Sequence, residues 1–136
     1  MSEPSVPDRP TWRLRSAACS DQGPVRAANE DAYFRDDDLG LYVVADGLGG
    51  HAAGEVASRL AVEAFTGFVS RSRADEDLTW PFGQDPSLTL DENCLITAAR
   101  LAHQRVNRAA AVDQDKLAGM ATTLVGVCLL YTSDAA

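Results

Sequence analysis

The chain has 136 residues, of which 46% are hydrophobic, and its formal net charge is −8 at pH 7. This length allows one domain with a hydrophobic core, and the acidic balance excludes the basic surface that nucleic-acid binding needs. No apolar stretch is long enough to span a membrane, and three widely spaced cysteines fit neither a zinc site nor paired disulfides, so we expect a cytoplasmic protein with reduced, buried thiols.

Residues 1–10 are predicted to form a flexible tail, because they are rich in proline and lack the apolar core of a signal peptide. A strand is predicted over residues 11–18, because the apolar residues Trp12 and Leu14 alternate there with charged residues.

Residues 20–33 place an arginine close to two adjacent carboxylates. Arg26 precedes Glu30 by four residues, and its planar guanidinium is suited to bind a phosphate group. If Glu30 and Asp31 begin a strand, their side chains point to opposite faces, so one can ligate a metal ion while the other holds its water. The alternative interpretation is an exposed loop with ordinary surface charges.

A β-hairpin is predicted next. Residues 31–34 and 41–45 have the character of short strands, and the polar segment 36–40 joins them as a turn. Three consecutive aspartates in this turn lack the loop pattern of a calcium-binding hand, so we interpret them as a solvated turn.

The second strand of this hairpin ends in Asp46, and four glycines follow within the next eight residues. A carboxylate at a strand tip beside such a loop can hold Mg²⁺ or Mn²⁺, because glycines let backbone carbonyls and water approach closely. The alternative is a simple Asp-Gly turn. Helical periodicity then predicts a helix over residues 53–69, whose partly positive N-terminus points toward the proposed site.

A loop and a second helix follow. Residues 71–86 are predicted to be a loop that Trp80 and Phe82 attach to the core. A capping box at residues 89–92 begins a helix that runs to about residue 111. His103 lies beside the apolar stripe of this helix and is predicted to be a surface or packing residue.

The last predicted element is a buried strand over the apolar, β-branched segment 122–130. Together, these elements assign the chain to the α+β class, and periodicity alone goes no further.

Four segments occur in order along the chain: SDQGPVRAANED at 20–31, VVADGLGGHAAGEVAS at 43–58, TWPFG at 79–83 and GMATTL at 119–124. In this order and spacing they resemble the N-terminal half of a bacterial type 2C protein phosphatase. The resemblance implies a four-layer α-β-β-α sandwich with metal ions at one end. It further implies that residues 11–130 form the N-terminal part of such a domain, which is truncated here.

The resemblance also implies roles for the matching positions. Asp46 corresponds to the carboxylate that bridges two Mn²⁺ or Mg²⁺ ions, while the Gly47 carbonyl and Glu30 correspond to ligands of one ion. Asp31 would act through a water molecule, and Arg26 would bind the substrate phosphate. The implied reaction is hydrolysis of phosphoserine or phosphothreonine in proteins by a metal-activated water.

His51 has two possible roles in this interpretation. It is either a general acid for the leaving serine oxygen or a structural residue that precedes the helix. Other branches of the family carry their histidine three residues earlier, where this chain has Leu48.

The end of the sequence departs from the family pattern. The later Gly-Asp-Ser-Arg segment and two later aspartates do not occur, and residues 131–136 do not match the expected continuation. We therefore expect the 136-residue chain to be inactive and only marginally folded by itself. The expected partners are phosphorylated proteins, the substrates of a serine/threonine kinase. Two alternatives remain: a phosphatase-fold domain that binds a phosphoprotein or metal without turnover, and an unrelated metal-dependent binding domain.

Overall fold

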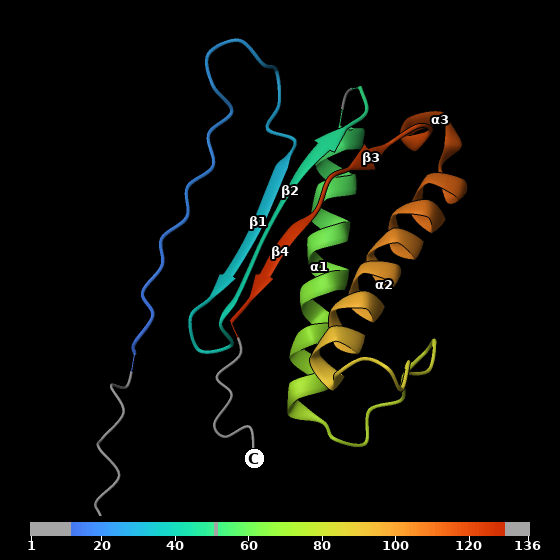
Figure 1. Ribbon diagram of the computed structural model, residues 1–136. Helices are drawn as coiled ribbons and strands as arrows, with labels where there is room; N and C mark the ends of the chain where they lie inside the picture. The colour runs from blue at the N-terminus through green and yellow to red at the C-terminus, as the bar shows by residue number, and fades with distance from the viewer. Residues whose placement is uncertain (1–11, 51, 130–136) are drawn as a thin grey trace, which may run out of the picture.

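The computed structural model describes residues 12–50 and 52–129, in which one antiparallel sheet packs against a pair of helices (Figure 1). The elements in chain order are β1 (Asp31–Asp36), β2 (Leu41–Leu48), α1 (Ala53–Ala74), α2 (Leu90–Val112), α3 (Gln114–Leu117), β3 (Ala121–Thr122) and β4 (Val125–Cys128). Helix α1 covers one face of the sheet, and α2 packs against α1. The α+β prediction is confirmed, and the described residues form one sheet layer and one helix layer of the expected sandwich.

The predicted hairpin is present. Strands β1 and β2 pair antiparallel, with Asp31 opposite Asp46 and Asp36 opposite Leu41. The Asp36 carboxylate accepts hydrogen bonds from the backbone N–H groups of Asp38 and Leu39 at 2.9 and 3.0 Å. The aspartate-rich segment is therefore a turn, as predicted, and it sets the register that brings Asp31 and Asp46 together.

Strands β3 and β4 pair with the other edge of β2 in a single shared register. The predicted strand over 122–130 is thus correct in position over its described part, but it is interrupted at residues 123–124 and is not buried. Val125 and Val127 are 62% and 52% exposed. The reason is that only the other face of this strand contacts α1, where a Cβ added to Gly126 would lie 3.3 Å from the Phe65 ring.

The predicted strand over residues 11–18 is wrong for the part that is described. Residues 12–18 form no strand and run apart from the sheet (Figure 1). The Ser16 backbone N–H donates to Asp37 at 3.0 Å, and the Ser16 hydroxyl also donates to Asp37. Alternation gives side chains a strand-like pattern, but a strand also needs a partner backbone, and in the described chain β1 pairs with β2 only.

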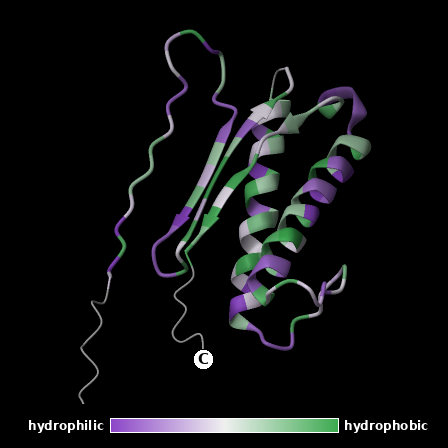
Figure 2. Ribbon diagram, viewed as in Figure 1, coloured by the Kyte–Doolittle hydropathy of each residue, from purple (hydrophilic) through white to green (hydrophobic). Residues whose placement is uncertain are grey.

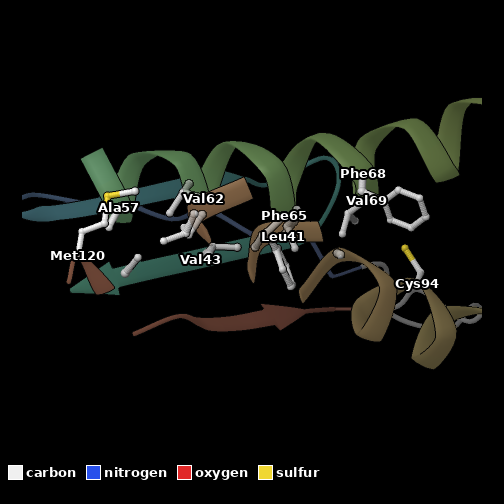
Figure 3. Close-up of a cluster of buried hydrophobic side chains, with 14 of the residues drawn as sticks. Leu41, Val43, Ala57, Val62, Phe65, Phe68, Val69, Cys94 and Met120 are labelled. Atoms are coloured by element: carbon white, nitrogen blue, oxygen red, sulfur yellow. The ribbon is translucent and has the colours of Figure 1, made fainter. Parts of the chain in front are cut away.

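The core lies between the sheet and α1 and continues to α2, which packs against α1. Leu41 and Val43 of β2 pack beneath Phe65, and Val69 and Phe68 continue the cluster toward Cys94 of α2 (Figure 3). The hydropathy colouring shows apolar residues on the strands and on the facing sides of the helices (Figure 2). Helix α1 begins where predicted and runs five residues further, to Ala74.

The capping box that begins α2 is confirmed. The Thr89 hydroxyl accepts a hydrogen bond from the Glu92 backbone N–H at 3.2 Å, and the Glu92 carboxylate accepts one from the Thr89 backbone N–H at 2.7 Å. The Thr89 N–H and, to a smaller extent, the Thr89 hydroxyl at 3.0 Å donate hydrogen bonds to the Glu92 carboxylate and hold its pKa below the ordinary value. The predicted start of α2 is therefore correct to within one residue.

Two aromatic residues were predicted to attach the loop before α2 to the core, and one of them does so. Trp80 is half-buried and contacts Phe68 edge-to-face, with ring centroids 5.4 Å apart. Phe82 is 36% exposed and lies beneath the Arg100 guanidinium instead, 5.8 Å from its ring centroid.

The three cysteines are free thiols. Cys94 is buried, as predicted, and burial raises its pKa, whereas the prediction is wrong for Cys19, which is exposed on a segment outside the sheet. Among the helices that the structure describes, none has the length and apolarity required to cross a membrane.

Candidate metal and phosphate site

Two aspartates face each other at one end of the sheet. The Gly47 backbone N–H donates to the Glu30 carbonyl at 3.0 Å, so the neighbouring pair, Asp31 and Asp46, occupies a non-hydrogen-bonded position of the ladder. Side chains are closest at such positions. Both aspartates are exposed on the sheet face that α1 does not cover. Like charges directly opposite are unfavourable, and a bound cation would offset this repulsion.

Glu30 directs its carboxylate to the opposite face, toward the start of α1. A Cβ added to Gly54 would lie 2.5 Å from Glu30 Oε1, and one added to Gly47 would lie 2.0 Å from the Gly54 carbonyl oxygen. Both distances are too short for any side chain. The strand end, the helix start and the Glu30 carboxylate therefore fit together only because positions 47 and 54 are glycine.

The electrostatics of the helix start favour this carboxylate. Ala52 is the N-cap residue of α1 and provides no side-chain hydrogen bond to the first turn. The free N–H groups of that turn carry partial positive charge, which stabilises an anion placed against them. The helix N-terminus was predicted to point toward the proposed site, and Glu30, one of the proposed ligands, lies against it.

The donor atoms at this end are of the chemical type that binds a hard divalent cation, although the carboxylates of Glu30 and Asp46 lie on opposite faces of the sheet. The carboxylates of Asp46 and Glu30 and the carbonyl of Gly47 are all oxygen donors, the type that Mg²⁺ and Mn²⁺ prefer. Within residues 12–50 and 52–129, no cluster of three or more His, Cys, Asp or Glu side chains is placed to hold a metal ion. A metal ion here would consequently depend on backbone oxygen and water as well as carboxylates, which suits Mg²⁺ in particular.

Sequence reasoning missed two threonines that fix the backbone of Asp46. The Asp46 backbone N–H donates to Thr123 Oγ1 at 3.1 Å, and the Asp46 carbonyl accepts from the Thr123 N–H at 2.9 Å. Thr122 Oγ1 also donates to this carbonyl at 3.1 Å. The Thr123 hydroxyl thus accepts the hydrogen bond that a backbone carbonyl of the neighbouring strand would normally accept, at the point between β3 and β4 where the strand is interrupted. The sequence feature that could have indicated this role is the pair of consecutive threonines in the segment GMATTL, to which no role was assigned.

Arg26 lies in the segment that leads into β1. This segment forms a loop at the end of the sheet where β2 ends and α1 begins (Figure 1). Asn29 closes this loop, because its side-chain oxygen accepts from the Asp31 N–H at 3.1 Å and its nitrogen donates to Ser20 Oγ at 2.7 Å. Gln22 donates to the Arg26 carbonyl at 2.6 Å. The loop is therefore shaped by its own polar side chains, and the Arg26 residue is exposed.

The structure thus brings together the backbones of residues 30–31 and 46–47, with the Glu30 carboxylate on the face toward α1 and the Asp31 and Asp46 side chains on the other face. Arg26 lies in the segment that leads into β1. The remaining predicted residue, His51, lies outside the described residues. His103 is exposed on α2 and lies 2.9 Å from Asn107 between side-chain nitrogens, which agrees with the prediction of a surface residue.

Comparisons with known proteins agree with this arrangement. A family model described as protein phosphatase 2C matches residues 25–135. The serine/threonine protein phosphatase PstP of Mycobacterium tuberculosis is 39% identical over 119 residues, which cover 88% of this chain and 20% of PstP. The serine/threonine phosphatase stp of Listeria monocytogenes is 33% identical over 116 residues, which cover 81% of this chain and 40% of that protein.

Solved structures give the same result. The catalytic domain of PstP in complex with two manganese ions superimposes with a TM-score of 0.62 at 37% identity, over 84% of this chain and 42% of that one. PppA of Pseudomonas aeruginosa, a regulatory component of its T6SS, gives a TM-score of 0.56 at 30% identity, over 85% and 43% of the two chains. The chain thus spans about a fifth of PstP and about two fifths of the solved domains.

Proposed function

The chain belongs to the protein phosphatase 2C family, and we propose that it supplies the first part of a metal-dependent site that hydrolyses phosphoserine and phosphothreonine in proteins. One observation carries the proposal beyond family membership. The Glu30 carboxylate fits against Gly54 and Gly47, one residue from the Asp31–Asp46 pair. Hard oxygen donors from two segments, residues 30–31 and 46–47, therefore lie at one end of the sheet.

The proposed metal ligands are the residues at the positions that match the family pattern. We propose that Asp46 bridges two divalent ions and that Glu30 and the Gly47 carbonyl ligate one of them. The two-manganese complex of the PstP catalytic domain supports Mn²⁺, and Mg²⁺ accepts the same donors. When bound, such ions lower the pKa of a water molecule and neutralise phosphoryl oxygens.

The other residues act on substrate and water. Arg26 binds the phosphate through its guanidinium, and Asp31 orients a water molecule toward the site from the position opposite Asp46. His51 remains a predicted general acid for the leaving oxygen, with the structural role as its alternative. Asn29 and the threonine pair at 122–123 hold the backbones of Asp31 and Asp46 in place.

The substrates that fit this chemistry are proteins phosphorylated on serine or threonine, and a serine/threonine kinase is the enzyme class that supplies them. We also propose a cytoplasmic location. Three free thiols support it, because such thiols persist in a reducing compartment.

The proposal is tested by Asp46→Asn, with Asp38→Asn as the matched control. Asp38 is an exposed turn aspartate whose backbone, rather than side chain, makes the described contact. Mn²⁺ binding is measured by calorimetry on the 136-residue chain. Hydrolysis of p-nitrophenyl phosphate and of a phosphothreonine peptide is measured on a version extended through the family's later acidic segments.

We expect Asp46→Asn to abolish both Mn²⁺ binding and hydrolysis and Asp38→Asn to leave both unchanged. Retained hydrolysis in Asp46→Asn at ordinary Mn²⁺ concentrations would refute the assignment of Asp46. If the extended protein binds Mn²⁺ and phosphopeptide but hydrolyses neither substrate, the non-catalytic alternative replaces the proposal.

A further inference from the structure

A polar groove between α1 and α2 carries an arginine cluster that the proposed phosphatase chemistry does not use. The groove has a volume of about 240 Å³, and Arg71 of α1 faces Arg105 and Arg108 of α2 across it. Gln104 adds an amide to the same lining, and Leu101 adds an apolar surface. We call this feature the arginine groove.

The three arginines of this groove are not neutralised by neighbouring carboxylates. In the part of the chain that the structure describes, the ion pairs join Arg35 to Asp37 and Arg59 to Glu63, and none involves the groove arginines. Glu63 is the carboxylate in the groove lining, and its Oε1 lies 3.4 Å from Arg59. The groove therefore concentrates positive charge on a chain whose net charge is −8.

The geometry of the groove suits a phosphate group. Each guanidinium is a planar fork of N–H donors that matches phosphate oxygens, and the forks come from both walls of the groove. A Cβ added to Gly67 would lie 3.4 Å from Arg71 Nη1, so this guanidinium lies against the surface of its own helix. The apolar Leu101 and Ala64 provide contact area for the neighbouring residues of a peptide.

We propose that the arginine groove binds a second phosphorylated residue of the same protein substrate whose first phosphate enters the metal site. This inference rests on the proposed function. Such a groove would make the chain selective for substrate segments that carry more than one phosphate. Once the first phosphate is bound at the metal site, the effective concentration of the second phosphate at the groove is raised.

The spacing of those phosphates follows from the helix. Glu63 lies nine residues and Arg71 seventeen residues beyond Gly54 on α1. At a rise of 1.5 Å per residue, the groove begins about 14 Å from the metal end and reaches to about 26 Å. An extended peptide covers about 3.3–3.6 Å per residue, so the two phosphorylated residues must be at least about four to eight positions apart.

The test uses fluorescein-labelled peptides and the 136-residue chain with Mn²⁺ present, because the first phosphate is proposed to enter the metal site. Mass spectrometry after each titration establishes that the peptides keep their phosphates. One peptide carries a single phosphothreonine, and a second carries another phosphothreonine eight positions away. Binding is measured by fluorescence anisotropy for the wild type and for Arg105→Gln/Arg108→Gln. We expect the doubly phosphorylated peptide to bind the variant about tenfold more weakly than the wild type.

A charge-matched control separates the groove from general electrostatics. Arg100→Gln/Lys116→Gln removes the same two charges from exposed positions outside the groove and should bind both peptides as the wild type does. Circular dichroism establishes that each variant keeps its helices. Equal losses in the two double variants would overturn the proposal, and so would equal binding of the two peptides by the wild-type chain.

Two further outcomes distinguish the ligand and the underlying function. If inorganic phosphate binds the groove and both peptides bind equally, the ligand is the free ion and the peptide proposal is overturned. If Asp46→Asn abolishes hydrolysis while Arg105→Gln/Arg108→Gln binds like the wild type, the groove proposal alone fails. Groove-dependent binding without hydrolysis by the extended protein would refute the proposed function alone.

Discussion

Gly54→Ala is expected to weaken Mn²⁺ binding although it adds only one methyl group, on the second residue of α1. The new Cβ would lie 2.5 Å from Glu30 Oε1, 2.7 Å from Glu30 Cδ and 3.0 Å from the Gly47 carbonyl carbon. An ordinary contact starts near 3.4 Å. The carboxylate therefore has to retreat, because the backbone of Gly47 blocks adjustment in the other direction.

The size of this retreat decides the effect on metal binding. Moving Oε1 from 2.5 Å to an ordinary contact displaces it by roughly 0.9 Å, several times the tolerance of about 0.2 Å in metal–oxygen distances. Disturbing the support of a metal ligand typically costs about 10–100-fold in affinity, and we expect a loss in this range. Stability should change little, because alanine is favoured over glycine in a helix by up to about 1 kcal/mol and this gain offsets part of the clash.

Gly67→Ala is the matched control for this experiment. Its added Cβ would contact only Arg71 Nη1, at 3.4 Å, on the same helix. Titration calorimetry with Mn²⁺ and thermal unfolding should show unchanged metal affinity and a higher melting temperature for Gly67→Ala. The reasoning fails if Gly54→Ala binds Mn²⁺ as tightly as the wild type, or if both variants lose affinity equally.

Three further predictions concern the supports of the site and the fold. Thr123→Val removes the hydroxyl that accepts the Asp46 N–H at 3.1 Å, so we expect a loss of about 1 kcal/mol in unfolding free energy and a several-fold loss in Mn²⁺ affinity. Unchanged calorimetric titrations would contradict the role of Thr123. Arg26→Ala in the extended protein should raise KM for a phosphothreonine peptide some tens of fold, or about 2 kcal/mol, without changing Mn²⁺ affinity. A collapse of metal affinity at constant KM would show instead that Arg26 supports the metal. Because hydrogen bonds from Thr89 lower the pKa of Glu92 in the folded state, its charge stabilises the fold above the ordinary glutamate pKa and this contribution is lost as pH falls through the folded value. The melting temperatures of wild type and Glu92→Gln should therefore differ at pH 7 and converge as the pH falls below the lowered pKa, and a constant difference would contradict this assignment.

Local signals predicted the parts of the fold that depend on neighbouring residues. The aspartate-rich turn predicted the hairpin, and the capping box at Thr89 predicted the start of α2. Asp46 was recognised from its place at a strand tip before a glycine-rich loop. The structure adds that the hairpin register places Asp31 directly opposite Asp46, which relates two motifs fifteen residues apart.

The errors arose where a distant partner decides the outcome. Residues 12–18 alternate as a strand does, but strand formation also depends on a backbone partner that alternation does not specify. Val125 and Val127 belong to an apolar run that predicts burial on both faces, yet α1 covers only one. The contact between Glu30 and Gly54 was missed for a related reason, since glycine in a loop indicates flexibility and gives no sign of what packs against it.

The second and fourth matching segments are best understood as one structural unit. Thr123 holds the backbone of Asp46 from 77 residues away, and a Cβ added to Gly49 would lie 3.1 Å from the Met120 Cα. Met120 is buried beside Ala57 at the start of the core (Figure 3). The segment at 119–124 supplies no proposed ligand. It nevertheless fixes the end of β2, on the edge opposite β1. Asp46 is consequently held by hydrogen bonds from its backbone to Thr122 and Thr123 on one edge and by pairing with β1 on the other, so the proposed bridging carboxylate projects from a backbone that is fixed on both sides.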